Sequence, residues 1–199
     1  MGSLFVVSAP SGAGKTTLCL RVRQRILDLR YSISYTTRAP RVGEVDGRDY
    51  FFVSQDRFRS MIDQGAFLEW AEVFGRYYGT GRVWIEEQLS SGRDVLVDVD
   101  VEGARQIKSN FPQAVFIFIL PPTFDELTRR LTGRHTETED QMRIRLERAR
   151  EEIGFRTMYD YLVVNDEIER AVGDLVTVIR AEGLRLDVGD RFWDAFFDG

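Results

Sequence analysis

A glycine-rich loop near the N-terminus carries the residue types that bind phosphate. Residues 8–17, SAPSGAGKTT, follow the apolar run LFVV and match the pattern G-x-x-x-x-G-K-[ST], except that Ala9 replaces the first glycine. Gly12 and Gly14 allow backbone N–H groups to turn toward an anion, and the following helix adds its positive dipole end. Lys15 is expected to reach the β- and γ-phosphates of a nucleoside triphosphate, and Thr16 to offer a hydroxyl to Mg²⁺. The residues expected to bind the triphosphate are Ala9, Pro10, Ser11, Gly12, Ala13, Gly14, Lys15, Thr16 and Thr17.

The loop departs from the pattern at one position, and its sequence has one alternative explanation that involves no phosphate. Alanine is tolerated at position 9 if its φ angle is negative, so we expect Ala9 to preserve the loop. The alternative is a glycine-rich turn that contains Lys15 and Thr16 by chance, but a strand before it and a helix after it favour a phosphate site. Asp98, at the end of a later apolar strand, is expected to act on Mg²⁺ through water. The loop therefore predicts a phosphoryl donor and leaves the acceptor open.

Composition narrows the class of protein. The 199 residues fit one compact domain with a sizeable core, and the net charge of −5 argues against a general nucleic-acid or membrane-surface binder. No apolar run approaches the length of a membrane span. Cys19 is the single cysteine, so no internal disulfide can form, which is typical of the reducing cytosol. We expect a cytoplasmic protein without nucleic-acid or membrane partners; for its assembly we expect a monomer or weak homo-oligomer.

Apolar runs and helical periodicity alternate along the chain. Continuous apolar strands separated by helices predict a parallel sheet covered on both faces, so the fold class is α/β. Two segments interrupt the alternation and are expected to act as flaps over one site, because ligands bind at the carboxyl ends of parallel strands. The expected strands span 4–8, 94–100, 114–122 and 159–166, the expected helices 15–29, 102–111, 124–133, 138–153 and 168–185, and the interruptions 34–81 and 124–156.

A series of sequence signatures indicates what accepts the phosphoryl group. SYTTRAPRVGEVDGRDYFFVS, GAFLEWAEVFGRYYGT, DVLVDVDVEGARQI, IFILPP and YDYLVVND occur in this order, and with the phosphate loop they cover the chain from Leu4 to Arg185. This series resembles the guanylate kinase family of P-loop nucleoside monophosphate kinases. The resemblance implies a P-loop NTPase-type sheet flanked by helices (1–33, 82–123 and 157–186), a small mixed α/β GMP-binding region (34–81) and a helical lid (124–156). It also implies ATP and GMP as substrates, with Mg²⁺ as cofactor, and leaves dGMP open as a second acceptor.

The resemblance assigns recognition of guanine to a group of polar side chains. Guanine offers N1–H and an N2 amino group as donors and O6 as an acceptor, whereas adenine has no such pair of donors and would leave a buried carboxylate unpaired. Local pattern alone also allows purely structural roles: Glu69 as the outward residue of an alternating strand, and the aspartates as caps of the next helix. The residues that match the family's guanine contacts are Glu69, Ser34, Thr80, Asp98 and Asp100.

The resemblance also assigns the acceptor phosphate to arginines and tyrosines. Arginine gives bidentate, charge-assisted contacts to phosphate, and tyrosine hydroxyls add neutral ones. Each residue could have a simpler role, with Arg38 and Arg41 as solvated loop charges and Tyr50 and Tyr78 as half-buried aromatics with wet hydroxyls. Their joint occurrence at matching spacings favours the phosphate site.

Phosphoryl transfer to a nucleoside monophosphate needs positive charge more than a base. The acceptor phosphate has a second pKa of about 6, so it is mostly ionised at neutral pH. The single histidine, His135, has polar neighbours and is expected to be a solvated lid residue. The resemblance picks Arg130, Arg134 and Arg145 as lid arginines that act with Lys15, and places Asn165 near the adenine. Arg129, Arg143 and Arg148 are expected on the solvent side.

Two other functions remain open from the sequence, together with the role of the C-terminal tail. One is a guanylate-kinase-like binding module without catalysis, and the other is a P-loop kinase for another small phosphate acceptor. An intact phosphate loop and lid argue against the first, and Glu69 with Ser34 against the second. The tail, 187–199, lies beyond the resemblance and is expected to dock on the protein's own core, with a dimer contact as the alternative. Its apolar residues at helical spacing are Phe192, Trp193, Phe196 and Phe197.

Overall fold

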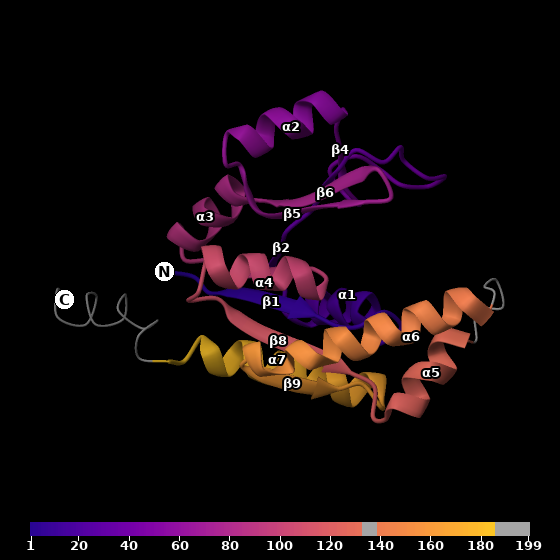
Figure 1. The fold of residues 1–199 in the computed structure, drawn as a ribbon. Coiled ribbons are helices and arrows are strands. Elements are labelled where there is room, and N and C mark those ends of the chain that lie inside the picture. Colours follow the sequence, from indigo (N-terminus) through magenta and orange to yellow (C-terminus); the bar gives the residue numbers. More distant parts are fainter. Residues whose placement is uncertain (133–138, 186–199) are drawn as a thin grey trace, which may run out of the picture.

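The computed structural model describes residues 1–132 and 139–185 (Figure 1). Its centre is a five-stranded parallel sheet with the order β2-β7-β1-β8-β9. The phosphate loop follows β1, the central strand, so the sheet delivers the loop to its carboxyl edge. The strands are β1 (Leu4–Ser8), β2 (Arg30–Tyr31), β7 (Val95–Asp98), β8 (Val115–Leu120) and β9 (Tyr161–Val164).

Helices cover both faces of this sheet, as the continuous apolar strands predict. Successive residues of β1 point to opposite faces: Phe5 and Val7 pack with α1 and α7, whereas Leu4 and Val6 pack with α3 and α4. All four side chains are almost completely buried, because parallel strands between two helical layers have no solvated face. The helices are α1 (Lys15–Arg25), α3 (Arg82–Ser90), α4 (Val101–Asn110) and α7 (Ile168–Glu182).

A second sheet stands apart from the first and has its own core. Four strands in the order β4-β3-β6-β5 form it, with one parallel pair and two antiparallel pairs. Phe58 and Met61 of α2 pack on Phe67 of β5 beneath one face, where stacked aromatic rings fill the space. The elements are β3 (Tyr35–Thr36), β4 (Phe51–Phe52), α2 (Gln55–Asp63), β5 (Phe67–Val73) and β6 (Arg76–Gly81).

Two helices project from the opposite side of the molecule (Figure 1). They are α5 (Phe124–Thr132), which follows β8, and α6 (Glu139–Gly154), which leads through the short 3₁₀ helix η1 (Phe155–Met158) into β9. Leu127 and Leu131 of α5 pack on Ala149 of α6 and form a small core of their own. This helix pair and the second sheet therefore lie on either side of the phosphate loop.

The first helix is shorter than its apolar spacing predicts. We expect a helix over 15–29, but α1 ends at Arg25, because Ile26 takes an extended backbone with φ −118° and ψ 92°. The chain must turn there to bring Arg30 beside Val95 and start β2. Leu29 is buried in the core from this turn, so its position in the apolar pattern reflects packing and not helix.

Candidate active site

The phosphate loop has the backbone that its glycines predict. Gly12 and Gly14 have φ angles of 86° and 89°, and α1 begins directly after them at Lys15. Among the described residues Phe74 alone is a non-glycine with positive φ, so Ala9 has the negative φ that the loop requires of it. The substitution of the first glycine is therefore compatible with the loop's shape.

Gly14 is held against Asn165 from the last strand connection. The Asn165 side-chain amide donates to the Ala13 carbonyl at 2.7 Å, and a Cβ built on Gly14 would lie 2.4 Å from that amide nitrogen. Asn165 is buried and supports the loop through this hydrogen bond. Its predicted place near the adenine stays a prediction, whereas its contact with the loop is direct.

Gly14→Ala is expected to damage both the loop and the fold. The added methyl group meets the Asn165 amide, and alanine at φ 89° carries a left-handed conformational cost of about 2 kcal/mol. We expect KM for ATP to rise about tenfold or more and the free energy of unfolding to fall by a similar 2 kcal/mol. Steady-state kinetics and urea unfolding measure the two effects. The control is Gly173→Ala inside α7, where nothing lies within 4 Å; there the free energy of unfolding should rise slightly. An unchanged KM for ATP in the Gly14 variant would contradict the assignment.

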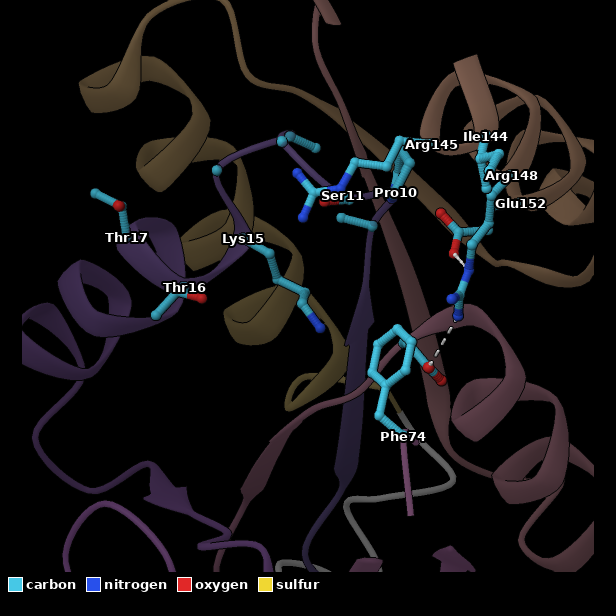
Figure 2. A pocket seen from close by; sticks show the side chains of 15 residues that line it. Pro10, Ser11, Lys15, Thr16, Thr17, Phe74, Ile144, Arg145, Arg148 and Glu152 are labelled. Atoms are coloured by element: carbon cyan, nitrogen blue, oxygen red, sulfur yellow. Dashed lines mark hydrogen bonds and ion pairs between the residues drawn. The ribbon is translucent and has the colours of Figure 1, made fainter. Parts of the chain in front are cut away.

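A cavity of about 630 Å³ opens above the phosphate loop (Figure 2). Every residue from Ala9 to Thr17 lines it, and α6 provides the facing wall. Arg145 extends from α6 toward the loop in Figure 2, so it shares the cavity with the Lys15 ammonium. Two cations and the loop's N–H groups make this cavity suited to a polyanion. We call it the donor cavity; its other lining residues are Phe74, Asp100, Ile144, Arg148 and Glu152.

Lys15 ties the loop to the neighbouring strand. Its ammonium lies 2.6 Å from the Asp98 carboxylate at the end of β7 and also donates to the Val99 carbonyl. The side chains of Lys15 and Asp98 are 18% and 14% exposed, so this ion pair is shielded from solvent. Lys15 is thereby held at the carboxyl edge of the sheet, where a bound phosphate could compete with Asp98 for it.

A second cavity of about 330 Å³ lies between the core and the loop residues on either side of β3, from Ser34 to Tyr50. Ser34 and Tyr50 line it on one side and Asp98 on the other, and Thr16 lines both this cavity and the donor cavity. We call it the acceptor cavity. The two cavities thus share Thr16, and Asp98 lines the acceptor cavity; these are the two residues predicted to act on Mg²⁺.

Glu44 lines the acceptor cavity and holds Arg38 and Arg41, two arginines that do not line it themselves. Its carboxylate accepts two hydrogen bonds from the Arg38 guanidinium, at 2.8 and 2.9 Å, and one from the Arg41 backbone N–H at 2.7 Å. These bonds lower the pKa of Glu44 to about 2, with the Arg38 contact as the largest cause. Arg38 also lies over the Tyr50 ring at 5.4 Å, and the ring centroids of Tyr50 and Tyr78 are 6.2 Å apart. Of the residues predicted to hold the acceptor phosphate, Arg38, Tyr50 and Tyr78 are therefore neighbours. Arg41 joins them through its backbone N–H, and its side chain is exposed.

Glu69 is a buried carboxylate, which rules out the role of an outward strand residue. It is 8% exposed and accepts a hydrogen bond from the Thr80 hydroxyl at 2.5 Å across the β5–β6 pair. Burial is the largest cause that raises the pKa of Glu69 to about 7, although the Thr80 bond acts in the opposite direction. A carboxylate held out of water with one oxygen engaged is suited to a ligand that brings its own N–H donors.

Asp100 does act as a helix cap, the structural role that its local pattern allows. It is the N-cap of α4 and accepts from the Gly103 N–H at 2.8 Å. Its other oxygen lies 3.9 Å from Arg148 of α6, which also contacts Glu152 at 3.2 Å. Arg148 is 61% exposed, as predicted for the solvent side, but it also connects α6 to the start of α4. Arg129 and Arg143, 76% and 71% exposed, do face solvent.

The other predicted lid residues divide into two groups. The Arg130 guanidinium is held by Glu126 at 2.7 Å and by the Asn165 carbonyl at 2.9 Å, so it fastens α5 to the β9 end of the sheet and does not line the donor cavity. Its catalytic role stays a prediction. Arg134 and His135 lie outside the described residues, as does the tail 187–199.

Three residues of this site have no place in the sequence-based prediction. Glu44 sits six positions after Arg38 in a loop without periodicity, and only the pairing itself reveals it. Glu152 follows Arg148 by four residues, a spacing that looks like an ordinary helical pair, yet it lines the donor cavity. Phe74 is the tip of a hairpin whose direction depends on the whole second sheet.

Fold and site together define a class. A parallel sheet with the phosphate loop after its central strand, a second inserted sheet and a projecting helix pair is the architecture of a P-loop kinase. A sequence model described as "Guanylate kinase" matches residues 1–182. The chain belongs to the guanylate kinase family.

Individual relatives agree with this assignment. "Guanylate kinase" of Dechloromonas aromatica is 52% identical over 183 residues, covering 92% of this chain and 91% of the relative. The protein of the same name from Salmonella paratyphi A is 52% identical over 196 residues, covering 98% and 95%. The crystal structure of guanylate kinase from Anaplasma phagocytophilum superposes with a TM-score of 0.75 at 33% identity, covering 93% of this chain and 88% of that one. The Salmonella match must extend into 187–199, so the expectation that the tail lies beyond the resemblance is wrong.

Proposed function

We propose that this protein transfers the γ-phosphoryl group of ATP to GMP, giving ADP and GDP, as an ATP:GMP phosphotransferase of purine nucleotide metabolism. The observation that carries the proposal is the donor cavity, with Lys15 and Arg145, which shares Thr16 with the acceptor cavity. The buried Glu69–Thr80 pair is the second element of the proposed acceptor site, although neither residue lines the acceptor cavity. Family membership supports it and disfavours both alternatives, the binding module and the kinase for another small phosphate.

The acceptor residues divide into base and phosphate contacts. Glu69 would accept from N1–H and the N2 amino group of guanine, while Ser34 and Thr80 would contribute hydroxyls. Arg38, held ready by Glu44, would take the acceptor phosphate together with the residues at its side. Because Glu69 has been desolvated by the fold itself, a base without two adjacent donors would leave its charge unpaired. The phosphate contacts are proposed for Arg38, Arg41, Tyr50 and Tyr78, and the base contacts for Ser34, Glu69, Thr80, Asp98 and Asp100.

Catalysis would rest on positioning and charge. The acceptor phosphate is ionised at neutral pH, so no side chain has to remove a proton from it. Lys15 would leave Asp98 for the β- and γ-phosphates, and Arg145 would approach them from α6. Arg130 and Arg134 complete the proposed set of lid arginines. These groups would bring two anions into line and stabilise the charge on the transferring oxygens.

The donor set near Thr16 fits Mg²⁺. Within residues 1–132 and 139–185 no cluster of three or more acidic, histidine or cysteine side chains could hold a metal. Mg²⁺ in such kinases is bound mainly by phosphates and water with one or two protein groups, and the exposed Thr16 hydroxyl and the Asp98 carboxylate meet that need. Bound there, Mg²⁺ would neutralise phosphate charge during transfer.

An acceptor screen tests the proposed activity. With ATP and Mg²⁺ present, a coupled assay of ADP release should show turnover with GMP and at least about 10²-fold less with AMP, CMP or UMP, since the buried carboxylate penalises bases that lack paired donors. Equal rates with GMP and AMP would contradict the guanine assignment. The same assay with dGMP measures how far the ribose hydroxyl matters.

The setting of the enzyme is proposed from more general features. None of the helices in the described part of the chain is long and apolar enough to cross a membrane. We propose a cytoplasmic location, because free nucleotides are its substrates and its single cysteine, Cys19, is buried. A monomer or weak homo-oligomer stays our expectation for assembly.

A further inference from the structure

Phe74 occupies a position that neither burial nor local conformation explains. It is the first of two residues that join β5 to β6, and it has a φ angle of 50°, followed by Gly75 at 70°. Two left-handed residues in such a loop normally call for asparagine, aspartate or glycine. A bulky side chain there is strained. Phe74 is also 99% exposed, so it contributes nothing to a core.

The exposed Phe74 ring borders the donor cavity. Phe74 lines that cavity together with the phosphate loop and α6, although it belongs to the acceptor-side sheet. Figure 2 shows it on the side of the cavity opposite Ile144. Ile144 is 60% exposed and lies one helical turn before Arg148, so the two present one face of α6 to the cavity. Two large apolar side chains therefore face the same polar cavity from opposite sides.

The hairpin that carries Phe74 also carries the acceptor residues. In the β5–β6 register Glu69 pairs with Thr80, Ala71 with Tyr78 and Val73 with Arg76. The ladder continues without interruption from the Glu69–Thr80 pair to the tip, because its one irregularity lies between Phe67 and Glu69. A ligand that fixes the base of this ladder also fixes the direction of the tip.

We propose that Phe74 is a positioning residue that closes the donor cavity when the acceptor binds. Acceptor binding at Glu69 and Thr80 brings the hairpin tip toward α6, and the Phe74 ring packs on Ile144 over the transferring phosphoryl group. The contact excludes water. Without it, water attacks the γ-phosphorus and breaks its bond to the β–γ bridging oxygen, which yields ADP, inorganic phosphate and a proton in place of GDP. The inference rests on the proposed function, because it assumes that GMP occupies the acceptor cavity.

The test uses the full-length chain and the variant Phe74→Asn. Asparagine tolerates the left-handed backbone, so the thermal midpoint should stay equal or rise. We expect kcat for GMP phosphorylation to fall about tenfold, KM for GMP to change less than about twofold, and the ratio of inorganic phosphate to GDP to rise about tenfold. Phe74→Tyr, which keeps the ring, should restore both kcat and the product ratio. Leu27→Asn is the control, because Leu27 is 86% exposed and borders neither cavity.

The partner on α6 is tested by a double-mutant cycle. Ile144→Asn should reproduce the rise in inorganic phosphate, and the double variant should be no worse than Phe74→Asn alone. Additive effects in the cycle, or an unchanged kcat and product ratio in Phe74→Asn, would overturn the inference. Its failure is distinguishable from failure of the proposed function: wild-type protein that phosphorylates GMP, with an indifferent Phe74→Asn, removes only the closing contact, whereas wild-type protein inactive on GMP removes both.

Discussion

Lys15→Met is expected to lower kcat for GMP phosphorylation by about 10³-fold, because it removes a preorganised cation from the phosphates as charge develops on them. The Lys15 ammonium is already at the carboxyl edge of the sheet, 2.6 Å from Asp98, so little reorganisation precedes its contact with a phosphate. Methionine keeps the length and much of the apolar stem. Single-turnover kinetics with saturating ATP and GMP measure the loss directly.

The same substitution leaves a shielded carboxylate without its partner. Asp98 is 14% exposed, so Lys15→Met should also lower the free energy of unfolding, by about 2 kcal/mol. Adding Asp98→Asn should recover that stability without recovering activity, which separates the fold from the chemistry. Lys108→Met is the matched control, since Lys108 lies on α4, away from the phosphate loop, and pairs with Asp160 at 3.6 Å. Retention of more than about a tenth of wild-type kcat would refute the role given to Lys15.

The parts of this fold that sequence predicts are those with a local cause. The phosphate loop follows from its glycines, and β1, β7, β8 and β9 follow from apolar runs bounded by turn residues. The strand β2 could not be predicted, because two residues carry no periodicity and Arg30 and Tyr31 become a strand only by pairing with β7. The apolar spacing predicts too long a helix for α1 for a related reason: Leu29 continues the spacing, but tertiary packing and not helix places it in the core.

The candidate site also divides into features with a local cause and features that depend on tertiary contacts. Resemblance identifies side chains such as Arg38 and Glu69, yet it says nothing of what they do without ligand. Their state depends on contacts between segments: Arg38 is held by Glu44, and Glu69 by Thr80 on the next strand. Helical spacing does not predict the contact of Arg148 with Asp100, because the spacing of Arg and Glu is the same whether the face meets solvent or a cavity. Such assignments need the placement of α6 against α4, which no local pattern encodes.

Glu69→Gln should have opposite effects on stability and on function. Ionising Glu69 in the fold is unfavourable, since burial raises its pKa from 4.5 to about 7. The folded protein therefore holds a proton that the unfolded chain releases, and stability is lost as pH rises from 4.5 to about 7. Glutamine keeps an oxygen for Thr80 and has no charge to bury. We expect the variant to be more stable than wild type by about 2 kcal/mol at pH 8, with the difference vanishing below about pH 4.5.

Glu69→Gln should impair function because guanine supplies the hydrogen-bond donors that burial takes away from the Glu69 carboxylate. A guanine bound at Glu69 brings N–H donors to the carboxylate, so binding needs the ionised form and should weaken as pH falls below about 7. Glutamine presents an N–H to another donor; kcat/KM for GMP should fall by about 10²-fold or more while KM for ATP stays within about twofold. Guanosine binding isolates Glu69 from the acceptor phosphate, whose own pKa of about 6 also affects GMP. Glu72→Gln, on the same strand but exposed, is the control. If guanosine binding by wild type does not change between pH 8 and pH 6, or if the variant gains no stability at pH 8, then Glu69 is not the buried carboxylate that reads the base.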